Sequence, residues 1–199
     1  MCGIVGIAGD IGTQEKKAFR ELLWLDALRG MHSTGVAAIA KDTNSRKKGS
    51  KHIRYLKCEG GPAEWFDYND HNKKYDDVLD HDVKVLIGHN RYATAGSVTC
   101  ENAHPFKFKH IIGVHNGTLG HMAVTDLEKE FKFKHDVDSA VLLYALSQTS
   151  ISKIYKELTG SLALVDRDWE TKRKFKVYPS AYANSWLVRT YKKRGGTYK

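Results

Sequence analysis

The second residue of the chain is a cysteine, so removal of Met1 would leave a thiol and a free α-amine on Cys2. A free α-amine has a pKa of about 7.7–8.0 and a free thiol one of about 8.5, so both groups titrate close to neutrality. Two such groups on one residue supply a nucleophile together with its own general base. A cysteine can also be simply a small apolar side chain, and the Met-Cys pair alone leaves both interpretations open.

Polar residues in later segments could recognise a zwitterionic substrate and stabilise an oxyanion. Arg91 is a planar donor suited to a carboxylate, although a lone arginine more often forms a surface ion pair. Asp138 begins a predicted helix, where it could cap the helix, favour the helix dipole or bind an ammonium group. Asn116 and Gly117 could offer a side-chain NH₂ and a backbone N–H as an oxyanion hole, or could form only a hairpin turn.

Short strands and helices are predicted to hold these residues near strand ends. Strands are predicted at residues 3–8, 36–40, 53–58, 83–88, 111–114, 161–165, 175–178 and 186–189, with 3–8 buried on both faces. Helices are predicted at 15–28, within 65–79, and at 124–130, 139–147 and 151–158, with Gly30 as a C-terminal cap of the first and a loop over 89–106. This pattern indicates an α+β fold with sheets layered against helices.

Composition limits the class of protein. The 199 residues suffice for one domain with a sizeable core. No apolar run is long enough to span a bilayer, and no basic segment precedes a hydrophobic stretch as in a signal peptide, so a cytoplasmic protein is expected. The net charge of +9 could attract nucleic acid or an acidic partner, or could reflect solvated loops and a basic tail.

The cysteines and histidines do not form a recognisable metal or disulfide pattern. Cys2, Cys58 and Cys100 are an odd, widely spaced set, which argues against a disulfide framework and for a reducing compartment. No C-x-x-C or H-E-x-x-H spacing occurs among the three cysteines and ten histidines. We therefore expect no metal site and no cofactor.

Several segments resemble, in order, the motifs of class II glutamine amidotransferases. They are Cys2-Gly3-Ile4-Val5-Gly6, Arg29-Gly30, Gly88-His89-Asn90-Arg91-Tyr92-Ala93-Thr94, Asn102-Ala103-His104-Pro105, His115-Asn116-Gly117 and Val137-Asp138-Ser139. The chain is thus similar over residues 2–165 to the N-terminal-nucleophile glutaminase domains of glucosamine-6-phosphate synthase and amidophosphoribosyltransferase. The resemblance implies one domain over residues 1–199, an α+β four-layer αββα sandwich of the N-terminal-nucleophile hydrolase type, and a divergent, basic segment over 166–199.

The resemblance also implies roles for individual residues. Cys2 would be the nucleophile, and Asn116 and Gly117 the oxyanion hole. Arg91 would bind the α-carboxylate of glutamine, Asp138 its α-ammonium group, and Thr94 would line the same pocket. Supporting roles are implied for the two remaining motif residues, Arg29 and His104.

The expected function is hydrolysis of the L-glutamine side-chain amide, with the ammonia passed to an acceptor enzyme. No synthase segment follows within the 199 residues, so we expect a separate synthase or acceptor subunit. Ala95 stands where some members carry a histidine, which weakens assignment to the glucosamine branch. The alternatives are an N-terminal-cysteine amidase for another amide, and a catalytically idle glutaminase fold that binds a partner or nucleic acid.

Overall fold

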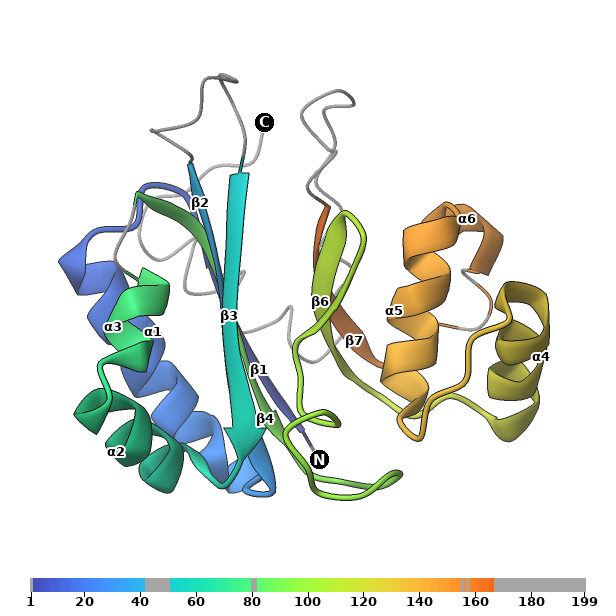
Figure 1. Ribbon diagram of the computed structural model, residues 1–199, viewed down its shortest axis with the longest axis horizontal. Helices are drawn as coiled ribbons and strands as arrows, with labels where there is room; N and C mark the ends of the chain where they lie inside the picture. The colour runs from blue at the N-terminus through green and yellow to red at the C-terminus, as the bar shows by residue number, and fades with distance from the viewer. Residues whose placement is uncertain (1, 42–50, 80–81, 155, 157, 167–199) are drawn as a thin grey trace, which may run out of the picture.

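The computed structural model describes residues 2–41, 51–79, 82–154, 156 and 158–166 (Figure 1). Within these residues the fold is mixed α+β and contains two antiparallel sheets. The strands predicted at 175–178 and 186–189 lie outside the described residues, as does nearly all of the basic segment 166–199.

The first sheet carries the beginning of the chain in an edge strand. Its order is β1-β4-β2-β3, with β1 at Gly3–Ala8, β2 at Ser33–Lys41, β3 at Lys51–Glu59 and β4 at Val83–Arg91. Strand β1 pairs with β4 so that Gly3 lies opposite Asn90, and β2 pairs with the same strand so that Ser33 lies opposite Arg91. This register puts Cys2 one residue beyond the last pair, next to Arg91.

The second sheet is smaller, and its central strand ends at the predicted Asn-Gly turn. Its order is β5-β6-β7, with β5 at Phe106–Phe108, β6 at Ile111–Asn116 and β7 at Ser161–Asp166. Asn116, the last residue of β6, pairs with Ser161, the first residue of β7. The start of β7 therefore lies at the same end of the sheet as the Asn116-Gly117 turn.

Helices lie beside both sheets (Figure 1). Helix α1 (Thr13–Leu25) continues into the 3₁₀ helix η1 (Asp26–Arg29), and α2 (Pro62–His71) and α3 (Lys74–Leu79) follow β3. Helices α4 (His121–Phe131), α5 (Asp138–Gln148) and α6 (Ile151–Ile154) lie on the far side of the second sheet in Figure 1.

Alternation along the central strands explains how one strand serves two hydrophobic clusters. In β2, Val36 and Ala38 belong to the cluster that packs against α1, α2 and α3. The intervening Ala37 and Ile39 belong instead to a cluster shared with β6. Successive side chains of a strand point to opposite faces, so β2 is buried on both. A third cluster lies between β5, β6 and the helices α4 and α5.

The predicted elements that fall within the described residues are confirmed in place, but several boundaries differ. The helix predicted at 15–28 changes to a 3₁₀ helix at Asp26. Gly30 is confirmed as a C-terminal cap, of that 3₁₀ helix, and its backbone is extended. Strand β1 is not buried on both faces, because Gly6 and Ala8 are exposed. Strand β5 was not predicted.

The largest boundary error concerns the segment predicted as a loop over 89–106. Strand β4 continues to Arg91, so His89, Asn90 and Arg91 are strand residues held between two neighbours. Asn90 explains this extension: its Nδ2 donates to the Leu23 carbonyl at 2.7 Å, and its Oδ1 accepts from Thr34 Oγ1 at 3.2 Å. A polar pattern can therefore continue a strand when each buried polar group finds a partner.

No helix in the part of the chain that the structure describes has the length and apolar character to cross a membrane. Within the same residues, no group of three or more His, Cys, Asp or Glu side chains is placed to hold a metal ion.

Candidate active site

Cys2 lies at the meeting point of both sheets. Its Sγ is 3.3 Å from the backbone N of Tyr92 and 3.4 Å from the Tyr92 carbonyl oxygen. Its own carbonyl accepts hydrogen bonds from Arg29 Nε at 3.1 Å and from Asn116 Nδ2 at 2.5 Å. Three segments that lie far apart in the sequence therefore position the backbone and sulfur of Cys2.

The environment of Cys2 makes a general base important. Burial raises the pKa of the Cys2 thiol, and the hydrogen bond from Tyr92 and the positive charge of Arg91 offset part of this effect. A raised pKa means that little thiolate is present at neutral pH without a neighbouring base. The half-buried thiol thus suits a mechanism in which proton removal accompanies attack.

Arg91 ends β4 with its guanidinium turned into the loop that follows. The side chain is buried, and its Nη1 donates to the Ser97 carbonyl at 3.0 Å while Nη2 donates to the Ala95 carbonyl. Burial lowers the pKa of Arg91, whereas the nearby Cys2 and Asp138 favour its charged form. A guanidinium has five N–H donors, so this group can still bind an anion.

Asp138 is the first residue of α5 and lies near the other cationic and nucleophilic groups. Its Oδ2 accepts from the Leu119 backbone N at 2.7 Å, and its Oδ1 accepts from the Ser139 N at 2.8 Å. Ionised carboxylates accept up to about four hydrogen bonds, so two backbone donors leave room for an ammonium group. The N-cap of α5 is Val137, so Asp138 does not cap the helix but favours the helix dipole from the first turn, which is compatible with ligand binding.

A buried histidine supports the Asn116-Gly117 turn. Nε2 of His115 lies 2.6 Å from the Thr159 carbonyl, and its Nδ1 lies 2.9 Å from Ser139 Oγ. A carbonyl only accepts, so Nε2 carries the proton and Nδ1 accepts from the serine hydroxyl. A Cβ on Gly117 would lie 2.4 Å from the Thr159 carbonyl, so the turn has no space for a larger residue.

The Arg29-Gly30 pair brings η1 against β4. A Cβ on Gly30 would lie 2.5 Å from the carbonyl carbon of Arg91, so the close approach of the two backbones requires glycine. Arg29 Nε is also 3.8 Å from Asp26 Oδ1, and burial raises the pKa of Asp26 to about 6. Arg29 thus reaches Cys2 directly, consistent with its expected supporting position.

Thr94 and His104, two of the expected site residues, form no hydrogen bond with Cys2 in the described part of the structure. Thr94 is exposed in the loop after Arg91. His104 is buried, stacks on His89 with ring centroids 4.0 Å apart, and neither of its ring nitrogens has a partner among the described residues. Burial lowers the pKa of His89 to about 3 and that of His104 well below its ordinary value, so both rings are neutral packing groups.

Sequence reasoning missed three residues that support the site. His32 Nδ1 accepts from the backbone N of Ala93 at 2.8 Å and its ring stacks on Tyr92, so it holds the segment that contacts Cys2. His89 and His115 lie beneath the same region. Both are within the segments that carry the resemblance, but nothing in a motif distinguishes a buried hydrogen-bonding histidine from a catalytic one.

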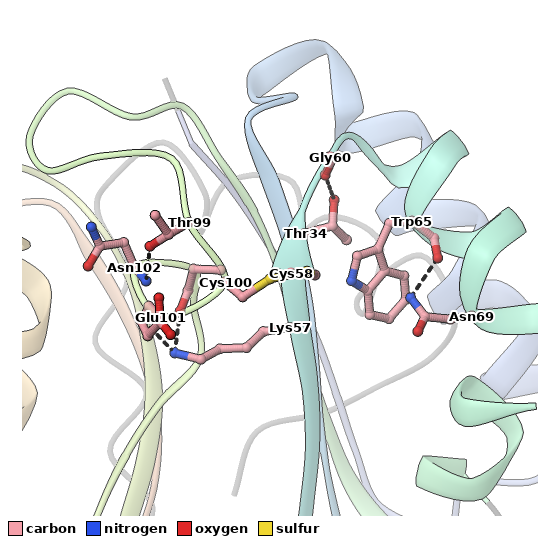
Figure 2. The surroundings of a disulfide bond; sticks show 11 residues. Thr34, Lys57, Cys58, Gly60, Trp65, Asn69, Thr99, Cys100, Glu101 and Asn102 are labelled. Carbon is pink, nitrogen blue, oxygen red and sulfur yellow. Dashed lines mark hydrogen bonds between the residues drawn. A yellow bond between two sulfur atoms is a disulfide. The ribbon is translucent and has the colours of Figure 1, made fainter. Parts of the chain in front are cut away.

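The expectation of reduced cysteines was wrong for one pair. Cys58 of β3 and Cys100 of the loop after β4 form a disulfide, shown in Figure 2, although 42 positions separate them in sequence. Among the described residues, Cys2 is the free cysteine. Widely spaced cysteines gave no sign of this pairing because it depends on how the loop folds back onto β3.

Known proteins similar to this chain include glutamine–fructose-6-phosphate aminotransferases and an amidophosphoribosyltransferase. Glutamine–fructose-6-phosphate aminotransferase of Aquifex aeolicus is 32% identical over 178 residues, 82% of this chain and 26% of that protein. Amidophosphoribosyltransferase of Archaeoglobus fulgidus is 31% identical over 180 residues, 82% of this chain and 36% of that protein. The corresponding aminotransferase of Helicobacter pylori is 28% identical over 170 residues.

No family model matches the chain. The chain spans about a quarter to a third of the length of these relatives, which leaves their remaining parts without a counterpart in the alignment. The similarity to both an aminotransferase and an amidophosphoribosyltransferase confirms the resemblance seen in the motifs. The chain is thus a distant homologue of the class II glutamine amidotransferase domain.

Proposed function

We propose that this chain hydrolyses the side-chain amide of L-glutamine through a thioester on Cys2. The observation that carries the proposal is the convergence of Arg29, Asn116 and the Tyr92 backbone on Cys2. Homology to the glutaminase domains of two enzyme families supports the same assignment. No cofactor is needed for this chemistry.

The proposed reaction begins with removal of Met1, which frees the α-amine of Cys2. This amine takes the thiol proton as the sulfur attacks the amide carbon. Asn116 Nδ2 and the Gly117 N–H stabilise the oxyanion, and the ammonium then protonates the departing ammonia. Water attacks the thioester, and glutamate leaves as the thiol is restored. The side-chain amide of Asn116 has two N–H groups. One donates to the Cys2 carbonyl, and the other is the donor proposed for the oxyanion.

Recognition of glutamine requires a cation and an anion held apart from the nucleophile. Arg91 would bind the α-carboxylate and Asp138 the α-ammonium group, and both are close enough to Cys2 to affect its pKa. Thr94 would line the pocket from the loop after Arg91. A zwitterion-binding pair has no use in hydrolysing a simple acyl amide, which argues against the alternative amidase.

The proposed fold is the four-layer αββα sandwich of N-terminal-nucleophile hydrolases. The arrangement of α1–α3, two sheets and α4–α6 in Figure 1 supports it. The side chains shared between β2, β4 and β6 support direct packing of the two sheets. We propose one domain over residues 1–199 on the same basis.

The ammonia acceptor would lie outside the matched part of this chain, and we propose a synthase or acceptor subunit as the partner. The relatives are about three to four times longer than the matched part, so they have room for an acceptor activity that the matched part of this chain would need from a partner. The competing proposal is an idle glutaminase fold that binds a partner or nucleic acid, motivated by the net charge of +9. Retention of Cys2 beside Asn116 and Arg91 favours the enzyme.

The decisive experiment measures glutamate release from L-glutamine by the purified protein and by Cys2→Ala. Intact mass establishes whether Met1 has been removed. We expect release by the parent and loss of at least about 10³-fold in the variant, because the nucleophile is gone. A glutamine analogue with a diazoketone in place of the amide should label Cys2 in the parent.

Cys58→Ala is not a suitable control because Cys58 is disulfide-bonded, so Ser147→Ala serves instead, as its hydroxyl contacts only helix α5 and the Gln148 amide. Absence of both turnover and labelling in a parent whose Met1 has been removed would favour the idle fold.

A further inference from the structure

The disulfide fastens the loop that leaves Arg91 to the far strand of the first sheet. Cys100 lies within residues 92–105, between the end of β4 and the start of β5, and its partner Cys58 lies on β3. Figure 2 shows the loop held beside β3 at this bond. Among the described residues, this disulfide is the covalent cross-link. It joins β3 to the segment whose carbonyl groups accept hydrogen bonds from Arg91.

Hydrogen bonds lead from the disulfide to the Arg91 guanidinium. Next to Cys100, Thr99 Oγ1 accepts from the Asn102 N at 3.3 Å. The buried Asn102 side chain then donates from Nδ2 to the Ser97 carbonyl at 3.1 Å. The same carbonyl accepts from Arg91 Nη1 at 3.0 Å. The position of Ser97, and with it the direction of Arg91, therefore depends on how the loop is held at Cys100.

Lys57 holds the same loop without a covalent bond. Its Nζ donates to the Glu101 carbonyl at 2.8 Å and to the Ala103 carbonyl at 2.7 Å, and lies 4.5 Å from the Phe106 ring centre. Burial lowers the pKa of Lys57 to about 8, so it is still cationic at neutral pH. This tie would keep the loop near β3 after reduction of the disulfide, so reduction loosens the loop without releasing it.

Both residues of the disulfide are partly accessible to solvent. Cys58 and Cys100 are both only half-buried. Cys58 also lines a cavity of about 430 Å³, together with Glu59, Glu64, Trp65 and Tyr68. Attack by a thiolate on a disulfide requires such access to one sulfur.

We propose that the Cys58–Cys100 pair is a thiol–disulfide exchange site that controls glutamine affinity by ordering the loop that orients Arg91. The inference rests on the proposed role of Arg91 in binding glutamine. The co-reactant is a dithiol: its thiolate attacks Cys58 or Cys100, the S–S bond breaks, and its second thiol resolves the mixed disulfide. The dithiol leaves as its own disulfide, and Cys58 and Cys100 each gain one electron and one proton.

The experiment compares the KM for glutamine of the full chain in its oxidised state and after reduction by dithiothreitol. If reduction lowers the fraction of molecules with an oriented Arg91 to about one tenth, the KM rises about tenfold. We expect kcat to change by less than about twofold, because the groups around the reacting amide remain in place. Peptide mass mapping after alkylation establishes the state of Cys58 and Cys100 in each sample.

The double variant Cys58→Ser/Cys100→Ser is the matched control, because dithiothreitol also protects Cys2. The variant should have the KM of the reduced parent, and dithiothreitol should not change it. An equal KM for the oxidised and reduced parent, with mapping that proves conversion, would overturn the inference.

Hydrogen exchange of residues 92–103 provides a readout that does not require enzymatic activity. Reduction should increase exchange in this segment and leave β6 unchanged. Equal exchange in both states overturns the redox inference, whereas absence of glutamate release in both states overturns the proposed function. The two failures are therefore distinguishable.

Discussion

The two sides of the candidate site are held in different ways. On the first sheet, Arg91 directs its guanidinium into the loop 92–105, and that loop is fastened by a disulfide and by Lys57. On the second sheet, Asn116 ends a strand, and the neighbouring His115 joins it to Thr159 and to helix α5. We call these the Arg91 side and the Asn116 side.

Because of this difference, structural changes on the two sides should affect substrate binding and the chemical step differently. The Arg91 side would bind the part of glutamine that does not react, and its order depends on contacts within a loop. The Asn116 side would stabilise the oxyanion, and it depends on the buried His115 of β6, which joins Thr159 in the segment before β7 to Ser139 at the start of α5. Loosening a loop should therefore weaken binding first, whereas damage to the turn should slow the reaction itself.

The largest effect is expected from Asn116→Ala on the Asn116 side. Loss of one oxyanion-hole donor typically reduces kcat about 10²–10³-fold. We expect this loss with a KM for glutamine that changes far less, measured by steady-state glutamate release. Asn72→Ala is the matched control, because the exposed Asn72 only contacts the Tyr68 carbonyl beside α2. An unchanged kcat in Asn116→Ala would contradict the assignment of the oxyanion hole.

A smaller effect with the opposite kinetic signature is expected from Arg91→Lys. Lysine keeps the charge but loses the bidentate geometry, and a hydrogen bond to a charged group contributes about 1.5–3 kcal/mol. The KM for glutamine should rise about 10–100-fold, with a smaller change in kcat. Arg20→Lys serves as control, since Arg20 pairs with Asp70 between α1 and α2. A fall in kcat at constant KM would remove the distinction between the two sides.

Acid should destabilise the folded protein through the buried histidines beneath both sides. Burial lowers the pKa of His89 to about 3, below its value of about 6.5 in the unfolded chain. Between these values the unfolded state binds a proton that the folded state does not, so the free energy of unfolding falls as pH decreases. From pH 7 to 5, His89 alone should cost about 2 kcal/mol.

Urea unfolding at pH 7 and pH 5 measures the fall in the free energy of unfolding. The variant His104→Phe tests whether buried neutral histidines cause that fall. The variant removes one neutral buried ring that has no hydrogen-bond partner among the described residues, and it retains an aromatic ring beside His89 and Phe106. Its stability should depend less steeply on pH than that of the parent. Identical slopes would mean that His104 takes up a proton without cost in the folded state.

The sequence predicted the elements and the family better than the contacts between them. Apolar periodicity located most described strands and helices, because it reflects which faces are buried. It failed at residues 89–91, where buried polar side chains continue β4. Their partners, such as the Leu23 carbonyl for Asn90, come from elements that only the folded chain brings together.

The candidate site shows the same division. The motifs led to Cys2, Arg91 and Asn116, and the structure gathers these residues, although their roles stay predictions. The pairing of Cys58 with Cys100 could not be predicted, because a disulfide depends on the distance between two Cα atoms, here 4.0 Å. The packing role of His104 was equally hidden, since burial is set by the surrounding fold.

Because β1 pairs with β4, the number of residues in β1 determines how far along β4 the Cys2 sulfur lies. Gly3 lies opposite Asn90, so the position of the Cys2 sulfur beside Tyr92 is set by counting along the ladder. Deleting one residue from β1 would shift the sulfur by about 3.4 Å along β4, or turn the alternate side chains to the other face. Side chains at the exposed positions Gly6 and Ala8 of β1 can therefore be altered more safely than the length of the strand.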